Sequence, residues 1–444
     1  MRIKAFLIPV ILWASASSLQ SQNLGPFVNA YHSVGLNEDG TVYTWGRNNV
    51  GQLGDNTTTN RSDPIKVLKG AYSGTTYLGD DSDNKITAVA IGYRHSMALA
   101  TDGTVYAWGA NGYGQLGDNT TTNRSTPIKV LEGAYSGTTY LGDDSDNKII
   151  AIAVGSYHSI ALANDGTVFA WGRNNYGNLG DNSTTNSSVP VKVEDGAYSG
   201  TTYLGDNSDN KITAVSAGGN YPSIALAEDG TVFAWGYNDP GNLGDGTTTS
   251  RSTPVKVLKG AYSGTTYLGD NSSNKIISVA AGESHRVALA RDGSVFAWGR
   301  GTLGQLGDGT SSNRSTPVKV TGVGGSGYLS LDKNAPTVSS VTSTTSDGTF
   351  KIGDGINVTV NFSEAVTLAG GNLVVPLETG DTDQTVTISS ISSATSASGT
   401  YTVQSGDASS DLTVSTIALS AGTLSDAASN NMSSFSIPSG SNLA

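Results

Sequence analysis

The chain contains no cysteine, only four histidines and comparatively few basic side chains. Without cysteine there are no disulfides, thiolate metal sites or cysteine nucleophiles, so packing and strand pairing must stabilise the fold. Its 25 lysines and arginines are outnumbered by 37 acidic residues, which gives a net charge of −12. Because nucleic-acid binding needs a basic patch, nucleic acid is not an expected partner. No apolar run reaches the length of a membrane span, so we expect no membrane-spanning segment.

What the sequence has instead is a repeat. The octapeptide at residues 102–109, Asp-Gly-Thr-Val-Tyr-Ala-Trp-Gly, recurs with small changes, and such a period indicates a repeat architecture. Asp-Gly between two apolar runs predicts a type I′ hairpin turn, and the residues that follow suit a half-buried strand. We therefore interpret the repeated tryptophans as core residues. They lie at steps of 63, 63, 64 and 63 residues, at Trp45, Trp108, Trp171, Trp235 and Trp298.

Each unit predicts four short strands, which in the second unit are 86–91, 95–100, 105–108 and 128–131. The last begins after Pro127, a position where proline costs no ladder hydrogen bond. Helical spacing is absent, and four such strands describe one blade of a β-propeller, which buries its faces against neighbouring blades. A ten-residue segment joins the units, first at 70–79, and predicts a small hairpin or flap on each blade edge.

The order of motifs resembles the regulator of chromosome condensation repeat family. Trp-Gly is followed by Gly-Gln-Leu-Gly-Asp, as at 51–55, then by the proline strand, and then by Gly-x-x-His-Ser-x-Ala-Leu-Ala before the next Asp-Gly. The similarity covers about residues 27–320 and implies a propeller at 24–333. Family propellers usually have seven blades, whereas five units are recognisable here, so closure of the ring stays open.

The segment before the repeat has the features of a secretory signal peptide, predicted at 1–22. Arg2 and Lys4 precede an apolar run at 5–14, and Ala14-Ser15-Ala16 supplies the small residues of a cleavage site. The run is too short to span a bilayer. We expect an exported protein, secreted or on the cell surface.

Residues 334–444 are expected to form a second β domain. Ile356, Val358, Val360 and Phe362 alternate with polar residues, as in a half-buried strand. About seven such short strands favour an Ig-like β-sandwich. The sequences at 362–366 and 426–430 resemble those of Ig-like modules of bacterial surface proteins. We expect the natural protein to continue past Ala444. The predicted fold class is therefore all-β, a propeller of five recognisable units followed by an Ig-like sandwich.

The four histidines occupy one slot of the repeat, at His32, His95, His158 and His285, and Pro222 fills it in the fourth unit. A catalytic base needs a nucleophile within reach, whereas a repeated slot serves the scaffold first. No triad is proposed, and the protein is not expected to be an enzyme. No cofactor is expected either.

Calcium is weighed as a minor alternative to plain surface turns, because clustered carboxylates offer the oxygen ligands that Ca²⁺ takes. The acidic loop at 80–84 lacks the spacing of an EF-hand. The candidate ligands are Asp80, Asp81 and Asp83 in that loop and Asp354, Glu364 and Asp426 in the second domain.

Two windows of the unit vary while its framework does not, one after Trp-Gly and one before the histidine slot. Both connect strands, and loops on a rigid scaffold are where binding residues concentrate. Their Tyr, Asn and Arg content is typical of protein-binding surfaces, although ordinary turns use the same residues. The predicted binding residues are Arg47, Asn48, Tyr113, Arg173, Tyr176, Tyr237 and Arg300 in the first window and Tyr31, Arg94, Tyr157 and Tyr221 in the second.

These observations favour a bacterial binding or adhesion protein that presents propeller loops to a protein or cell-surface ligand, with the Ig-like domain as a spacer. A secreted enzyme inhibitor is the main alternative, since one propeller of the resembled family blocks β-lactamases. A carbohydrate-active or other propeller enzyme would need several carboxylates around the axis, and the sequence offers no such set. Nucleotide exchange on a small GTPase, known for the family, is disfavoured by export and by the acidic charge.

Overall fold

A computed structural model describes residues 23–24, 30–135, 139–198, 202–219, 222–331, 335–346, 348–380, 383–407, 412–414, 416–426, 430–440 and 443. The predicted signal peptide lies outside these residues. In the described part of the chain there is one short 3₁₀ segment, η1 (Val323–Gly325), and no helix long and apolar enough to cross a membrane. Two compact units divide the chain. One is Met1–Arg291 with Val295–Leu329, and the other is Asp292–Ser294 with Ser330–Ala444.

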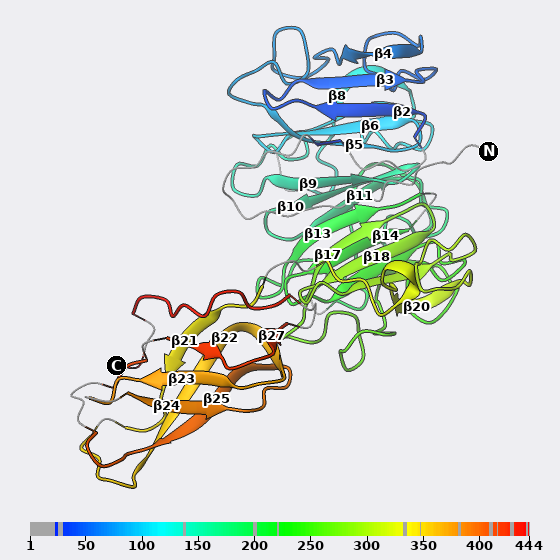
Figure 1. The fold of residues 1–444 in the computed structure, drawn as a ribbon. Helices are drawn as coiled ribbons and strands as arrows, with labels where there is room; N and C mark the ends of the chain where they lie inside the picture. The colour runs from blue at the N-terminus through cyan, green and yellow to red at the C-terminus, as the bar shows by residue number, and fades with distance from the viewer. Residues whose placement is uncertain are drawn as a thin grey trace. The chain divides into compact units, whose positions relative to one another are not determined.

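The first unit is a series of four-stranded antiparallel sheets, each made of strands that are consecutive in sequence (Figure 1). The first sheet contains β1 (Asn23–Leu24), β2 (His32–Leu36), β3 (Val42–Gly46) and β4 (Arg61–Lys66), and the second contains β5 (Ile86–Ile91), β6 (His95–Ala100), β7 (Val105–Gly109) and β8 (Arg124–Lys129). The third contains β9 (Ile149–Val154), β10 (His158–Ala163), β11 (Val168–Gly172) and β12 (Ser187–Lys192). The fourth contains β13 (Ile212–Ala217), β14 (Ser223–Ala227), β15 (Val232–Gly236) and β16 (Arg251–Lys256), and the fifth β17 (Ile276–Ala281), β18 (His285–Ala290), β19 (Val295–Gly299) and β20 (Arg314–Lys319).

The Asp-Gly dipeptides turn the chain between the second and third strands of each sheet, as expected. The predicted type I′ geometry is wrong, because that turn needs positive φ at both residues and only the glycine has it. In the second sheet Asp102 Oδ1 accepts a 2.8 Å hydrogen bond from the Thr104 amide. Gly103 has φ +96°, a conformation that a side chain would strain. The turn sets the register of β6 and β7, so that His95 pairs with Gly109 at the far end. The prediction of an all-β chain of repeated four-stranded sheets is confirmed.

The core of this unit lies between consecutive sheets. Four apolar clusters each combine residues of one sheet with residues of the next. Figure 1 shows the sheets following one another in chain order, with β2–β4 at one end of the series and β17–β20 at the other. The predicted core tryptophans lie in these clusters, since Trp108, Trp171, Trp235 and Trp298 are fully buried, while Trp45 in the first sheet is half-buried.

The ten-residue segment between units fastens one sheet to the next. An isolated bridge joins Tyr77 of this segment to Leu68, which precedes it. Within it, Tyr72 is buried, and its ring packs edge-on against that of Tyr106 in the following sheet, with 5.5 Å between ring centroids. The Ala71 amide donates to the Pro127 carbonyl of that sheet at 2.9 Å. The predicted flap is therefore part of the packing between sheets.

The second unit contains two antiparallel sheets around one apolar core. One sheet has the order β21–β22–β25 with β27 beside β22, and the other has the order β24–β23–β26. Their bounds are β21 (Val338–Thr342), β22 (Gly355–Ala369), β23 (Leu373–Leu377), β24 (Gln384–Ile388), β25 (Ala394–Thr402), β26 (Ala418–Leu419) and β27 (Thr423–Ser425). Val358, Val360 and Phe362 of β22 are buried, as the alternation predicts. The Ig-like topology itself stays a prediction.

Candidate binding face

The two variable windows meet at one end of every sheet for which both are described. The Arg47 amide donates to the Tyr31 carbonyl at 2.9 Å, and the Arg173 amide donates to the Tyr157 carbonyl at 3.0 Å. In the fifth sheet Arg300 and Ser284 make the same bond at 2.8 Å. The windows are adjacent because the residue before each histidine slot and the residue after each Trp-Gly flank the same end of a hairpin.

Tyrosines from neighbouring sheets form a continuous row at this end. The ring centroids of Tyr31 and Tyr93 lie 5.3 Å apart, those of Tyr93 and Tyr157 5.7 Å, and those of Tyr157 and Tyr113 5.4 Å. All three pairs are edge-on or tilted, the geometries that aromatic pairs prefer. Tyr31 is 54% exposed and the others are half-buried, so the row keeps one edge in solvent.

Arginine side chains pack over this row. The Arg47 guanidinium lies 5.3 Å from the Tyr31 ring centroid, and that of Arg173 lies 4.9 Å from the Tyr113 centroid. Arg94 lies 5.1 Å from the ring of the tyrosine that precedes it. Cation–π contacts of this kind hold the guanidiniums over the tyrosine rings. We call the group the Tyr–Arg strip: Tyr31, Arg47, Tyr93, Arg94, Tyr113, Tyr157 and Arg173.

The hydroxyl groups at the start of the strip interact as a pair. Hydrogen bonding to the Tyr93 hydroxyl raises the pKa of Tyr31. The same interaction, together with Arg94, lowers the pKa of Tyr93.

Tyr93 is a member of the strip that was not among the predicted binding residues. It occupies the same window as Tyr157, and that equivalence was the available signal. What the sequence did not show is its central place, between the rings of Tyr31 and Tyr157.

Two of the remaining predicted residues pair with each other. Tyr176 is 39% exposed and pairs with Tyr237, with ring centroids 4.7 Å apart. Tyr237 also donates to Asp239 Oδ2 at 3.4 Å. Arg300 is exposed, and its Nε donates to Thr302 Oγ1 at 3.0 Å. Tyr221 lies outside the described residues.

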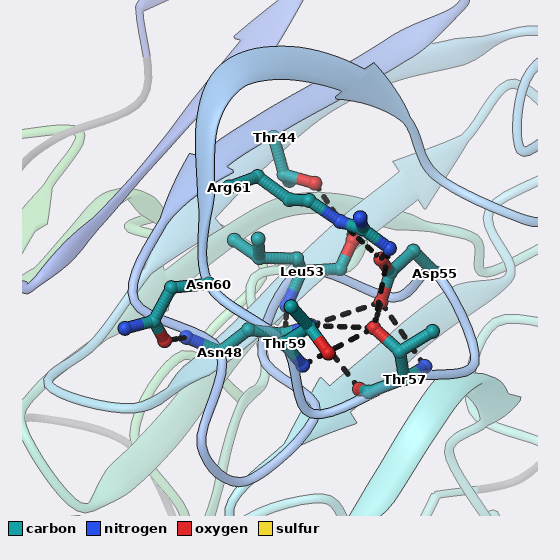
Figure 2. A network of polar contacts seen from close by, with 8 residues as sticks. All are labelled: Thr44, Asn48, Leu53, Asp55, Thr57, Thr59, Asn60 and Arg61. Atoms are coloured by element: carbon teal, nitrogen blue, oxygen red, sulfur yellow. Dashed lines mark hydrogen bonds and ion pairs between the residues drawn. The ribbon is translucent and has the colours of Figure 1, made fainter.

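The prediction for Asn48 is wrong, because its side chain is fully buried. Its Nδ2 donates to Asp55 Oδ1 at 2.9 Å and its Oδ1 accepts from the Leu53 amide at 2.9 Å (Figure 2). Asp55 in turn receives Arg61, whose Nη2 lies 2.7 Å from Oδ2. Side chains in these positions recur in the later loops, as with Asn111 and Asp118. Asn48 therefore stabilises the loop that carries Arg47 and presents nothing to a partner.

The histidines join consecutive sheets. His32 Nε2 lies 2.8 Å from Ser96 Oγ, and Ser96 Oγ donates to the Gln52 carbonyl at 3.1 Å. Because the serine proton is committed to that carbonyl, the histidine Nε2 must be the donor. Burial lowers the pKa of His32 to about 4 and, with the charges of two other histidines, that of His95 to about 3. These are scaffold contacts.

The calcium candidates already accept protein donors. Asp80 Oδ2 accepts the Thr76 and Tyr77 amides at 2.7 and 2.9 Å. Asp81 accepts the Ser73 hydroxyl and the Asp83 amide, at 2.8 and 3.0 Å. In the second unit Asp354 accepts the Lys351 amide and Asp426 accepts the Asn430 amide, both at 2.8 Å, and Glu364 is half-buried on β22. Among the described residues no group of three His, Cys, Asp or Glu side chains could hold a metal. Calcium binding stays a prediction.

Repeated four-stranded sheets packed face to face, with tryptophan cores and loops gathered at one end, define a β-propeller repeat protein. A family model described as the RCC1-like domain matches residues 27–402. The chain belongs to the RCC1-like domain family. The match extends beyond the first compact unit into the second.

The chain is also similar to individual proteins of known sequence or structure. It is 31% identical to the ultraviolet-B receptor UVR8 of Arabidopsis thaliana over 286 residues, which are 64% of this chain and 55% of the receptor. It is 33% identical to the probable human E3 ubiquitin-protein ligase HERC4 over 332 residues, covering 66% of this chain and 28% of the ligase. The crystal structure of human WBSCR16 covers 66% of each chain at 26% identity, with a TM-score of 0.53. The chain thus spans about half the length of the first curated relative and about a quarter of the second.

Proposed function

We propose that this protein is an exported or cell-surface binding protein whose Tyr–Arg strip contacts a protein partner. The observation that carries the proposal is the strip itself, a row built from three different sheets by residues that are not part of the repeated framework. Tyr and Arg are the side chains most enriched at binding hot spots. Tyrosine offers a large contact area with few rotamers to freeze.

The charge of the strip favours an acidic partner surface. Arg47, Arg94 and Arg173 lie within it, and no carboxylate occurs in the windows of the first three sheets. Elsewhere the chain is acidic, with a net charge of −12, so the strip differs in sign from its surroundings. Guanidinium groups bind carboxylates with two parallel hydrogen bonds. We therefore expect the contact on the partner to contain aspartate or glutamate side chains.

Export and the spacer role of the second unit belong to the same proposal. The basic and apolar pattern of residues 1–22 supports export. The second unit has its own core, and after residue 334 it carries nine acidic residues against one basic residue, which suits a solvated spacer. Adhesion and tight inhibition of one enzyme would both use the strip, and they differ in whether the partner is a surface component or a soluble enzyme.

The test compares capture by three forms of the full chain. The first is the wild type, the second is Arg47→Ser/Arg94→Ser/Arg173→Ser, and the third is the charge-matched control Lys69→Ser/Lys85→Ser/Lys351→Ser, in which all three lysines are exposed. Each form is immobilised and exposed to extracellular proteins, and bound proteins are identified by mass spectrometry.

We expect one or a few proteins to bind the wild type and the lysine control and to be lost from the arginine variant. A partner retained equally by all three forms would contradict the role of the strip. A labelled single-stranded oligonucleotide is measured in parallel, since stacked tyrosines with arginine are also a platform for bases. Arginine-dependent binding of the oligonucleotide, without protein capture, would replace the protein partner with nucleic acid.

A further inference from the structure

Consecutive sheets are joined by one repeated set of contacts. His32 of the first sheet bonds to Ser96 of the second, and Trp108 Nε1 of the second donates to the Gln52 carbonyl of the first at 2.9 Å. The same tryptophan bond joins the later sheets, at 2.9, 3.0 and 3.1 Å from Trp171, Trp235 and Trp298. Each sheet thus presents Trp and Ser to the sheet before it, which we call its Trp face. It presents His and a main-chain carbonyl to the sheet after it, which we call its Gly face.

Two glycines of the Gly face lie directly against the next sheet. A Cβ on Gly51 would lie 2.6 Å from Ser125 Cα, and one on Gly54 would lie 3.0 Å from Trp108 Nε1. Both glycines have positive φ, so backbone conformation alone accounts for the residue type. What matters here is the space beside them, which the next sheet fills.

On the fifth sheet the equivalent space is open. No atom lies within 4 Å of a Cβ placed on Gly304, and one on Gly307 would meet only Val320 of its own sheet. Along β18, Val287 and Leu289 are half-buried, whereas every residue of β6 and β10 is buried. Within the described residues the His285 side chain has no hydrogen-bond partner. The described strands that follow this sheet in sequence, β21 to β27, belong to the second unit, and none of them continues the repeat.

The first sheet exposes the complementary surface. Trp45 is half-buried, whereas the other four repeat tryptophans are fully buried. Pro64 on β4 is exposed, whereas its equivalents Pro127, Pro190, Pro254 and Pro317 are buried. Neither Ser33 nor Trp45 has a side-chain hydrogen-bond partner in the part of the chain that the structure describes. These two surfaces lie at opposite ends of the series of sheets in Figure 1, so they do not meet within one chain.

We propose that the Gly face of the fifth sheet binds the Trp face of the first sheet of a second copy of this chain. The contact would repeat the one between consecutive sheets, with His285 bonded to Ser33 of the other copy and Trp45 Nε1 of that copy donating to the Gln305 carbonyl. The histidine of the pair is present on the fifth sheet as His285, and the serine is present on the first sheet as Ser33. At the junction of the fourth and fifth sheets, by contrast, Pro222 and Arg286 occupy the histidine and serine positions. A second copy is the occupant that reproduces an interface this chain already forms within itself.

The contact is heterologous, because two different surfaces meet. Such contacts produce a closed ring when the rotation between copies allows it and an open series when it does not. None of these residues belongs to the Tyr–Arg strip, so the proposal is tested independently of the proposed function.

The test uses two full-length variants, each with one face blocked. Trp45→Glu places a charge on the Trp face, and Val287→Glu places one on the Gly face. Val323→Glu, at a residue that is 95% exposed, is the matched control. Self-association is measured by sedimentation over a wide range of concentration, and circular dichroism verifies that each variant is folded. If a glutamate variant unfolds, Trp45→Ser or Val287→Ser takes its place.

We expect the wild type and the control to associate with increasing concentration, and each blocked variant to associate at least about tenfold more weakly, as loss of a hot-spot residue implies. An equimolar mixture of the two blocked variants should form a dimer and nothing larger, because one intact face remains on each. The proposal is overturned if the wild type stays monomeric, if either variant associates as the wild type does, or if the mixture stays monomeric while the control associates.

Discussion

Arg286 Nη2 lies 3.4 Å from the carbonyl oxygen of Pro222, and this contact replaces the His–Ser pair that joins the other sheets. Arg286 occupies the serine slot and Pro222 the histidine slot. The guanidinium is fully buried, also donates to the Gly282 and His285 carbonyls, and has no carboxylate partner among the described residues. Burial lowers the pKa of Arg286 to about 9. A Cβ placed on Gly218 would lie 3.1 Å from Arg286 Nη1, whereas one placed on Gly155 would meet the ring of His158.

The two substitutions should therefore depend on each other. Arg286→Ser alone leaves carbonyls unpaired and a void, and Pro222→His alone crowds the guanidinium, so each should lower the free energy of unfolding by about 2 kcal/mol or more. The double variant restores the pair found at the other junctions and should be close to the wild type. Urea unfolding of the four proteins gives the coupling energy. Additive effects would mean that the two sites are independent.

The buried histidines predict a loss of stability in mild acid. The pKa values of His32 and His158 are lowered to about 4, so between that pH and 6.5 the unfolded chain binds protons that the folded chain excludes. Stability is therefore full above pH 6.5 and falls as the pH is lowered, by about 3 kcal/mol at pH 4 for each such histidine.

Urea midpoints measured from pH 8 to pH 4 check this sign. A His32→Gln/His158→Gln variant should be less stable at pH 8 but should show a shallower dependence on pH. An equally steep dependence in that variant would assign the acid sensitivity to other groups.

The loop network in Figure 2 predicts a stability effect where the sequence suggested binding. Asn48→Ala removes the donor to Asp55 and the acceptor for the Leu53 amide, so it should lower the free energy of unfolding by about 2–4 kcal/mol. The neighbouring Asn49 is exposed, and Asn49→Ala should change the free energy of unfolding by less than about 0.5 kcal/mol. Equal effects of the two substitutions on thermal unfolding would contradict the structural role of Asn48.

Replacement of Tyr113, Tyr176 and Tyr237 with alanine should weaken partner binding while the fold persists. Tyr176 is exposed, the other two are half-buried, and aromatic pairs contribute about 0.5–1.5 kcal/mol each. We therefore expect a loss of unfolding free energy of at most about 3 kcal/mol for the triple variant. A larger loss in calorimetry, with binding by the remaining folded protein unchanged, would place these tyrosines in the core.

Much of the fold could be predicted from the sequence because its determinants are local. The Asp-Gly turns and alternating apolar residues specify hairpins, and the period shows that the hairpins repeat. The partners of side chains across sheets are not local. The ring of Tyr93 meets Tyr31 and Tyr157 only because three sheets stack at one spacing, and no single unit contains that information. Asn48 was misassigned because a fully buried asparagine and an exposed one look alike in a turn sequence. The sequence shows that Arg286 stands where the other units have serine. Its contact with Pro222 across two sheets could be found only from the structure.

The central claim is that repeated side chains stabilise the sheets while the strip recognises the partner. The most direct measurement is a titration of the captured partner against two variants, Arg47→Ser/Arg94→Ser/Arg173→Ser and Asn48→Ala, with thermal unfolding recorded for both. The account predicts that the arginine variant loses binding and keeps its melting temperature. It predicts that Asn48→Ala melts earlier, but that its folded fraction binds with unchanged affinity. The opposite pattern, with binding lost in Asn48→Ala and kept in the arginine variant, would contradict the account.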